Sequence, residues 1–167
     1  MSAHFELRGE GVLVSLHPNE VELLRNVPAE LQTALSGPSS KDDPVYNRLF
    51  PSAYLDPTEE SAEREWQELV HPELLRERLA ALELVTATLD RAEKKRGRAE
   101  VELAPEEVEA WLHVLNDARL ALGTRLGITE DHEAEEIDPS KPEAAAHAMY
   151  GWLTWLQNDL VETLLGE

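Results

Sequence analysis

Carboxylates are the most abundant reactive side chains of this chain, whose 167 residues include 34 Asp and Glu against 15 Lys and Arg. Acid–base catalysis by a carboxylate pair requires two groups in different environments, so that their pKa values move apart. The acids here recur along charged helical segments, and no pair is singled out by its neighbours. The pattern is typical of solvated helix faces, and it predicts no catalytic carboxylate pair.

Metal and nucleophile chemistry have as little support. The segment 130–138, EDHEAEEID, groups acids around His132, but its spacing does not match the EF-hand loop, which needs glycine at its sixth position. We expect a solvated acidic loop there. The six histidines form no HExxH pair, and the chain contains no cysteine, no GxSxG nucleophile elbow and no GxxxxGK[ST] phosphate loop. These absences predict no enzymatic activity, no metal site and no bound cofactor.

The formal net charge of −19 bears on the class of partner. Nucleic-acid affinity comes largely from neutralising phosphates, and anionic membranes attract basic segments, so we expect neither direct DNA binding nor membrane binding. One segment runs against this charge, because residues 91–98, RAEKKRGR, contain Arg91, Lys94, Lys95, Arg96 and Arg98. These cations either contact an acidic partner or a phosphate backbone, or they complement the dipole at a helix C-terminus within a solvated loop.

Two further arginines lie beside small residues in an apolar helical segment. They are Arg119 and Arg125, in the stretch 115–127, LNDARLALGTRLG. Arginine in this setting either forms internal ion pairs or anchors a partner through bidentate hydrogen bonds. Both interpretations stay open at this point.

The last helical segment, at about residues 140–165, carries a tryptophan outside its apolar stripe. At about 100° per residue, that stripe contains Met149, Leu153, Leu156, Leu160 and Leu164. Trp155 falls on the polar side, with Asp159 and Glu162. Tryptophan on a polar face is enriched at protein–protein contacts. The alternative is that a neighbouring segment of the chain covers Trp155.

Residues 36–57 form a long connection rich in Gly, Pro, Ser and Asp. Its second half is nevertheless crowded with large apolar side chains, so we expect it to pack on the body of the protein: Val45, Tyr46, Leu49, Phe50, Tyr54 and Leu55. Because Tyr46, Phe50, Tyr54 and Trp155 have no obvious core, we predict an exposed protein-binding surface near this segment and the outer face of the last helix. Its occupant is a partner protein or a second copy, which would make a homodimer.

Periodicity predicts the elements that position these residues. Alternating apolar residues indicate a β-hairpin of residues 4–8 and 12–16, with residues 99–103 as a third strand. Five helical segments are expected. The first begins at Pro18 and is kinked or divided by Pro28, and the second covers 58–70 with Trp66, Leu69 and Val70 on one side. The others extend from Pro72 to about Lys95, from Pro105 to Gly123 or Gly127, and over about 140–165. The predicted fold class is α+β, predominantly helical, with a small N-terminal antiparallel sheet packed on a helical bundle.

The chain shows no sign of further domains or of a membrane anchor. It has no internal repeat and no second block of core composition, so we expect a single domain over residues 1–167. No run approaches the roughly 18 apolar residues that a membrane span needs. The start lacks the basic and apolar regions of a signal peptide. We therefore expect a cytoplasmic location.

Three stretches are more specific than generic helix patterns: PVYNRLFPSAYLDP at 44–57, WLHVLNDARLALGTRLGI at 111–128 and HAMYGWLTWLQNDLVETL at 147–164. They resemble an actinobacterial family that was long catalogued as a domain of unknown function and is now named for the oxidative-stress regulator AosR. The resemblance implies a cytoplasmic, non-enzymatic regulator that supports transcription of oxidative-stress genes through another transcription protein, such as an alternative sigma factor. Redox sensing by paired cysteines has been attached to the family, and this chain departs from that pattern because it has no cysteine.

Overall fold

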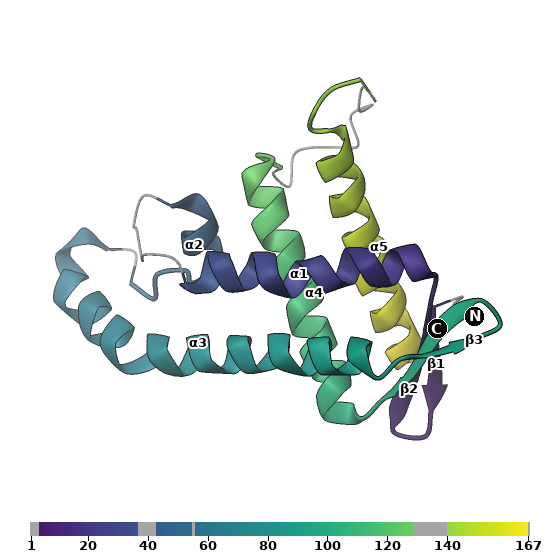
Figure 1. Cartoon of the computed structure of the whole chain (residues 1–167). Coiled ribbons are helices and arrows are strands. Elements are labelled where there is room, and N and C mark those ends of the chain that lie inside the picture. The colour runs from purple at the N-terminus through teal and green to yellow at the C-terminus, as the bar shows by residue number, and fades with distance from the viewer. Residues whose placement is uncertain (1–3, 37–42, 55, 129–139, 167) are drawn as a thin grey trace.

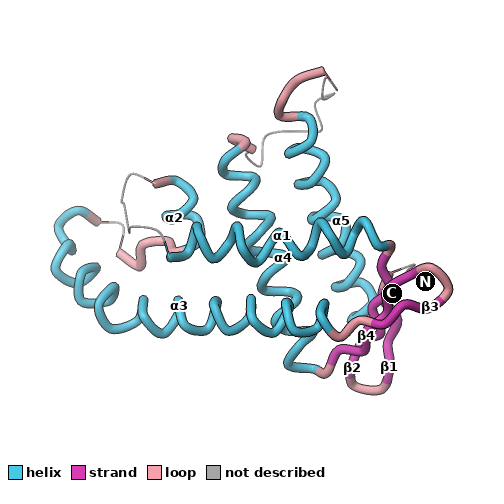
Figure 2. The backbone as a smooth tube through the Cα atoms, viewed as in Figure 1, coloured by secondary structure: helices cyan, strands magenta, loops and turns pink. Residues whose placement is uncertain are grey.

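The computed structural model describes residues 4–36, 43–54, 56–128 and 140–166, and it shows a mainly helical protein with one antiparallel sheet at one end (Figures 1 and 2). The predicted α+β, predominantly helical class is therefore confirmed. A short 3₁₀ helix, Pro57–Glu59, precedes the longest helix. In chain order the elements are β1 (Phe5–Arg8), β2 (Gly11–Leu16), α1 (Pro18–Ser36), α2 (Pro44–Leu49), α3 (Glu60–Asp90), β3 (Glu93–Lys95), β4 (Arg98–Leu103), α4 (Pro105–Arg125) and α5 (Ala144–Leu165).

The sheet has the strand order β1-β2-β4-β3, and each neighbouring pair is antiparallel. Val14 of β2 lies opposite Phe5 of β1 and Val101 of β4. Because side chains alternate across a sheet, these three buried residues share the face that packs on the helices. The predicted N-terminal hairpin and its third strand are confirmed.

Sequence periodicity does not predict the fourth strand, β3. The helix expected to reach Lys95 ends at Asp90, and the basic segment then folds into the β3–β4 hairpin. Its turn consists of Arg96 and Gly97, with φ angles of 52° and 79°. Left-handed values at both central positions are what a two-residue type I′ turn requires. The basic segment is therefore part of the sheet and not a loop after a helix.

Two helices continue through prolines that the sequence marks as breaks. α1 is continuous through Pro28 and α3 through Pro72, so the predicted division at His71-Pro72 is wrong. A proline removes one backbone hydrogen bond and crowds the preceding turn, which bends a helix without ending it when its flanks are packed. Figures 1 and 2 show the first turns of α3 bent away from its long, straight remainder.

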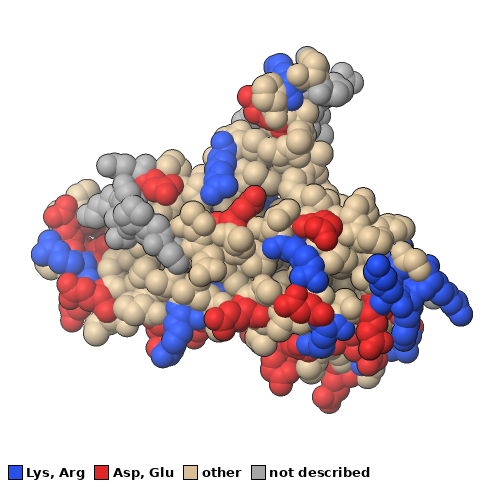
Figure 3. All heavy atoms as spheres, in the orientation of Figure 1, with Lys and Arg blue, Asp and Glu red and all other residues tan. Residues whose placement is uncertain are grey.

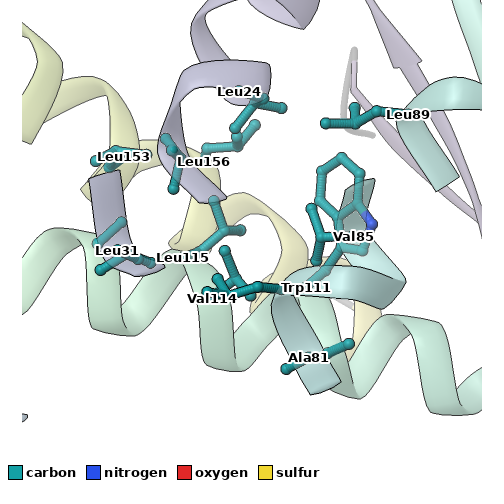
Figure 4. Packing of buried hydrophobic residues seen from close by; sticks show 14 of the residues in the cluster. Leu24, Leu31, Ala81, Val85, Leu89, Trp111, Val114, Leu115, Leu153 and Leu156 are labelled. Atoms are coloured by element: carbon teal, nitrogen blue, oxygen red, sulfur yellow. The ribbon is translucent and has the colours of Figure 1, made fainter. Parts of the chain in front are cut away.

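The core lies where α1, α3, α4 and α5 meet the inner face of the sheet (Figure 4). Trp111 of α4 is buried at its centre, and the indole N–H donates a hydrogen bond of 2.9 Å to the hydroxyl of the fully buried Thr88. In α5, Met149 is only partly buried and Leu164 is exposed. The buried part of the predicted α5 stripe is Leu153, Leu156 and Leu160.

The ends of the last two helices differ slightly from the prediction. α4 begins at Pro105 as expected and ends at Arg125, two residues before Gly127, whose φ is 70°. Gly123 lies inside α4, where an added Cβ would come within 2.9 Å of the Tyr150 ring. α5 begins at Ala144. Within the part of the chain that the structure describes, no helix combines the length and the apolar character needed to cross a bilayer.

Candidate functional site

A cavity of about 640 Å³ lies between α2, the segment that follows it and the first turns of α3. Figure 1 shows these elements at the end of the molecule remote from the sheet. Three of the four aromatic residues predicted to bind a partner line this cavity, namely Tyr46, Phe50 and Tyr54. The polar and charged side chains around them include Asn47, Asp56, Glu60, Glu63, Arg64 and His71. We call this cavity the aromatic cleft.

α2 holds the aromatic side of the cleft in place. The Asp43 carboxylate accepts a hydrogen bond of 2.9 Å from the backbone N–H of Val45, and Pro44 begins the helix, which is the usual chemistry of a helix start. Tyr46 and Phe50 are only 8% and 3% exposed. The expectation that this segment packs on the body is confirmed, but the expectation that Tyr46 and Phe50 are exposed is wrong. Tyr54, at 41% exposed, is the aromatic residue of this set that faces solvent.

The floor of the cleft is a cluster of rings joined by polar contacts. A hydrogen bond of 2.6 Å connects the Tyr46 hydroxyl and Nε2 of His71, and burial raises the pKa of Tyr46. The His71 ring lies 4.5 Å from the Phe50 ring, centroid to centroid. On the other side of Phe50, the Arg78 guanidinium is 4.6 Å from the ring centroid and donates to the Leu49 carbonyl. These contacts hold the side chains of Tyr46 and Phe50 in place.

The wall opposite the rings is the first part of α3, and it is acidic. The Glu63 carboxylate accepts hydrogen bonds from the Gln67 amide at 2.9 Å and from the Tyr54 backbone N–H at 2.8 Å. The hydrogen bond from Gln67 and those from the segment Ser52–Tyr54 lower the pKa of Glu63. Hydrogen bonds from Thr58 likewise lower the pKa of Asp56. Both groups are therefore carboxylates at neutral pH, and the cleft attracts cations.

Sequence reasoning missed His71, Glu63 and Gln67 as parts of a site. It grouped Trp66, Leu69 and Val70 on one side of this helix, and Leu69 is 72% exposed. The available signal is the spacing of polar residues at positions 60, 63, 64, 67 and 71, which is the helical pattern of a single face. From sequence alone, a polar stripe of this kind is interpreted as facing solvent, because the segment that lies across the cavity from it is not known.

Trp155, the fourth predicted aromatic residue, is not part of the cleft. It is 49% exposed on α5, and its ring makes an edge contact with His4 at a centroid distance of 4.9 Å. His4 directly precedes β1, so Trp155 lies at the sheet end of the molecule. The prediction of one surface combining Trp155 with Tyr46, Phe50 and Tyr54 is therefore wrong. Both α2 and α5 pack on α4, but Tyr46 of α2 faces His71 of α3, whereas α5 also contacts β1.

A buried polar cluster connects His4 to α1 and α5. The Glu20 carboxylate is 2.9 Å from Nε2 of His4, and it accepts hydrogen bonds from the backbone N–H of His17 and the Trp152 indole. Burial acts to raise the pKa of Glu20, but the hydrogen bonds from these three neighbours outweigh it, and the pKa is lowered. On the other side of the imidazole, Nδ1 of His4 is 4.0 Å from the Asp159 carboxylate. This cluster fixes the ring on which Trp155 rests.

The basic segment divides into structural and exposed cations. Arg91 makes a bidentate contact with Glu107, with one N–O distance of 2.7 Å, and this pairing lowers the pKa of Glu107. Arg98 donates to the side chain and the backbone carbonyl of Ser15. The cations at the end of the β3–β4 hairpin, which we call the basic tip, are Lys94, Lys95 and Arg96. Figure 3 shows Lys and Arg gathered at this end of the molecule.

The two arginines of α4 have different surroundings. Arg119 is partly buried, and its guanidinium donates to the Asn116 side chain at 3.1 Å. Arg125 is exposed and borders a small groove between α1, α4 and α5. The acidic segment 130–138 lies outside the described residues. Among the residues that are described, no group of three or more His, Asp or Glu side chains is placed to hold a metal ion.

Comparisons with known proteins place the chain in a family. Residues 1–164 match the family described as a domain of unknown function, DUF2017. The chain is 33% identical to "Oxidative stress regulator AosR" of Mycobacterium tuberculosis over 184 residues, covering 91% of this chain and 81% of the relative. The identity and coverage are the same for the protein of that name from Mycobacterium bovis. No solved structure matches. The chain therefore belongs to the DUF2017 family and is a relative of the mycobacterial proteins named AosR, as its three specific stretches indicate.

Proposed function

We propose that this protein is a non-enzymatic, cytoplasmic regulator of the transcriptional response to oxidative stress, and that it acts through contacts with another protein. The observation that carries the proposal is the 33% identity with oxidative stress regulators over 91% of the chain. The relationship extends over nearly all of the described fold. A shared regulatory role is the simplest account of it.

The charge distribution favours a protein partner over DNA. The net charge of −19 repels a phosphate backbone. Direct nucleic-acid binding through residues 91–98 is the alternative function, but Arg91 and Arg98 are bonded within the fold. The basic tip then offers three cations, few for a DNA site that must overcome the charge of the whole molecule. We therefore favour a partner in the transcription machinery, with an alternative sigma factor as the first candidate.

The sensing step has to differ from a dithiol switch within this chain, because the sequence has no cysteine. Its two methionines are Met1 and Met149, and Met149 is packed against the core. Oxidation of a packed methionine damages a core and does not give a clean reversible signal. We propose that the oxidative signal reaches this protein through its partner.

The test is a deletion of the gene in its host, followed by transcript profiling before and after hydrogen peroxide. We expect the induction of oxidative-stress genes to be reduced and to be restored by the wild-type chain. Purified alternative sigma factors of the host are then tested for direct binding by biolayer interferometry, and duplex DNA is tested by fluorescence anisotropy. An unchanged stress response would refute the regulatory role. Micromolar DNA binding that weakens with salt and is lost in K94E/K95E/R96E would show instead that the protein acts by binding DNA directly.

A further inference from the structure

The inner face of α3 changes character along its length. In the second half of the helix, this face is apolar and enters the core through Leu82, Val85 and Leu89. At 3.6 residues per turn, positions 60, 63, 64, 67 and 71 continue the same face toward the N-terminus, and all five line the aromatic cleft. The cleft therefore lies along the same face of α3 that enters the core, beyond the last apolar side chains that this face contributes to the core.

The cleft has the dimensions of a groove for a chain segment. Its α3 wall extends from Glu60 to His71, which at about 1.5 Å per residue is roughly 16 Å of helix. The opposite side presents Tyr46, Phe50 and Tyr54. A groove of this length matches about three turns of a bound helix, in which anchors recur at positions i, i+3 or i+4, and i+7.

The charge around the cleft selects a cationic occupant. Four carboxylates line it against one arginine: Asp56, Glu60, Glu63 and Glu68, with Arg64. Glu63 is held by hydrogen bonds to Tyr54 and Gln67 and is already oriented. Aromatic faces add attraction for cations, and Phe50 displays this chemistry by packing against Arg78. A second copy of this chain is a poor occupant, because each copy carries a net charge of −19.

We propose that the aromatic cleft docks a cationic, amphipathic segment of the partner protein, with Lys or Arg side chains against Glu60, Glu63 and Glu68 and an apolar anchor against Tyr54. This inference rests on the proposed function, since it assigns the surface through which the regulator meets its partner. It also states the chemistry of that partner: a helical segment with basic residues three or four apart and large apolar residues on the adjoining face.

The probe is a fluorescein-labelled 14-residue peptide with Lys at i, i+4 and i+8 and Leu on the adjoining face. Its controls are a scrambled peptide of the same composition and a peptide with Glu in place of Lys. Binding is measured by anisotropy at physiological salt to the wild type, to E60Q/E68Q and to E22Q/E83Q. The last variant removes two exposed helical carboxylates that do not line the cleft and changes the net charge equally. Tyr54→Ala tests the apolar anchor, and melting temperatures check that every variant is folded.

We expect the helical basic peptide to bind and both control peptides to bind at least about tenfold more weakly. The affinity should fall about tenfold in E60Q/E68Q, since two charge pairs are lost, and less than about twofold in E22Q/E83Q. Equal losses in the two variants, or equal binding of the scrambled peptide, would overturn the proposal in favour of unspecific charge attraction. Self-association in sedimentation that is lost in both K94E/K95E/R96E and E60Q/E68Q would assign the cleft to a second copy.

The same variants separate this inference from the proposed function. If the wild-type chain restores the stress response of the deletion strain and folded E60Q/E68Q restores it equally, the cleft is not the docking surface, although the regulatory role stands. If the wild type itself makes no difference to that response, the proposed function fails, whatever the peptide does. The proposal predicts a third result, in which E22Q/E83Q restores the response and E60Q/E68Q does not.

Discussion

Arg78 connects the floor of the aromatic cleft to the core, and its removal has a calculable cost. Its guanidinium donates to the Leu49 carbonyl at the end of α2, packs on the Phe50 ring and lies 3.8 Å from the Asp117 carboxylate of α4. Asp117 is a buried acid, and burial raises its pKa although Arg78 acts in the opposite direction. An Arg78→Met variant keeps most of the apolar stem and removes the cation.

The expected loss is about 2–3 kcal/mol in the free energy of unfolding at pH 7. Removing one partner of a fully buried pair costs about 3–5 kcal/mol. The Arg78 and Asp117 side chains retain 27% and 12% exposure, which places this pair below that range. For a chain of this size, the corresponding fall in melting temperature is roughly 5–10 °C. The double variant R78M/D117N should recover about 1–2 kcal/mol, because a neutral amide needs no countercharge.

The sign of the pH dependence follows from the raised pKa of Asp117. The folded state binds this proton more tightly than the unfolded state, so ionisation of Asp117 weakens the fold as the pH rises through the folded-state pKa. D117N alone should therefore be neutral or stabilising at pH 7, and the cost of R78M should shrink as the pH is lowered toward 4. Urea unfolding followed by circular dichroism at pH 7 and pH 4 measures both. The reasoning is refuted if R78M/D117N is no more stable than R78M, or if D117N costs more than about 1 kcal/mol at pH 7.

Substitutions at three further positions test other parts of the fold. Glu20→Gln should cost about 1–3 kcal/mol at pH 7, and the difference from wild type should shrink as the pH falls below the ordinary value of 4.5 and through the lowered folded-state pKa, because the stabilising carboxylate is then protonated; a loss independent of pH would contradict this. Thr88→Val leaves the buried Trp111 indole without its acceptor and should cost about 1–3 kcal/mol in urea unfolding, whereas Thr88→Ser should retain most of the stability. Gly151→Ala, where an added Cβ meets nothing within 4 Å, should raise the free energy of unfolding by about 0.5–1 kcal/mol, and a loss would argue against a solvent-facing position on α5.

The parts of the fold that the sequence predicts are those with strong local periodicity. In the N-terminal hairpin, β2 alternates between buried and half-buried residues, and α4 begins at a proline that fits a first helical turn. β3 escapes prediction because its three residues are all exposed and charged, and because the turn uses Arg96-Gly97 where Asn-Gly would be the usual signal. Arginine rarely adopts positive φ by itself. It does so here because β4 is already paired to β2, which supplies a template for one more strand.

The site is predictable in its chemistry but not in its assembly. The crowding of Tyr46, Phe50 and Tyr54 in a loop-like segment indicates that this segment packs, and the three do come together in one cavity. The sequence gives no information on which helix packs against them, so Trp155 is wrongly joined to the same surface. That choice depends on contacts between segments distant in the chain, such as the hydrogen bond between Tyr46 and His71. Local periodicity gives no information on contacts between distant segments.

Pro72 is informative even though it does not end the helix. Packing of α3 against α1 and α4 overrides the local preference for a break, and a bend remains. The inner face of α3 is polar before this proline, and after it the face enters the core through Leu75, Leu82, Val85 and Leu89, with Arg78 as a charged exception. Stability of the fold alone does not explain why α3 extends beyond the core with carboxylates on its inner face. The extension is accounted for if the first turns of α3 exist to present an acidic wall opposite the aromatic rings, so that the core ends near Pro72 and the binding surface begins there.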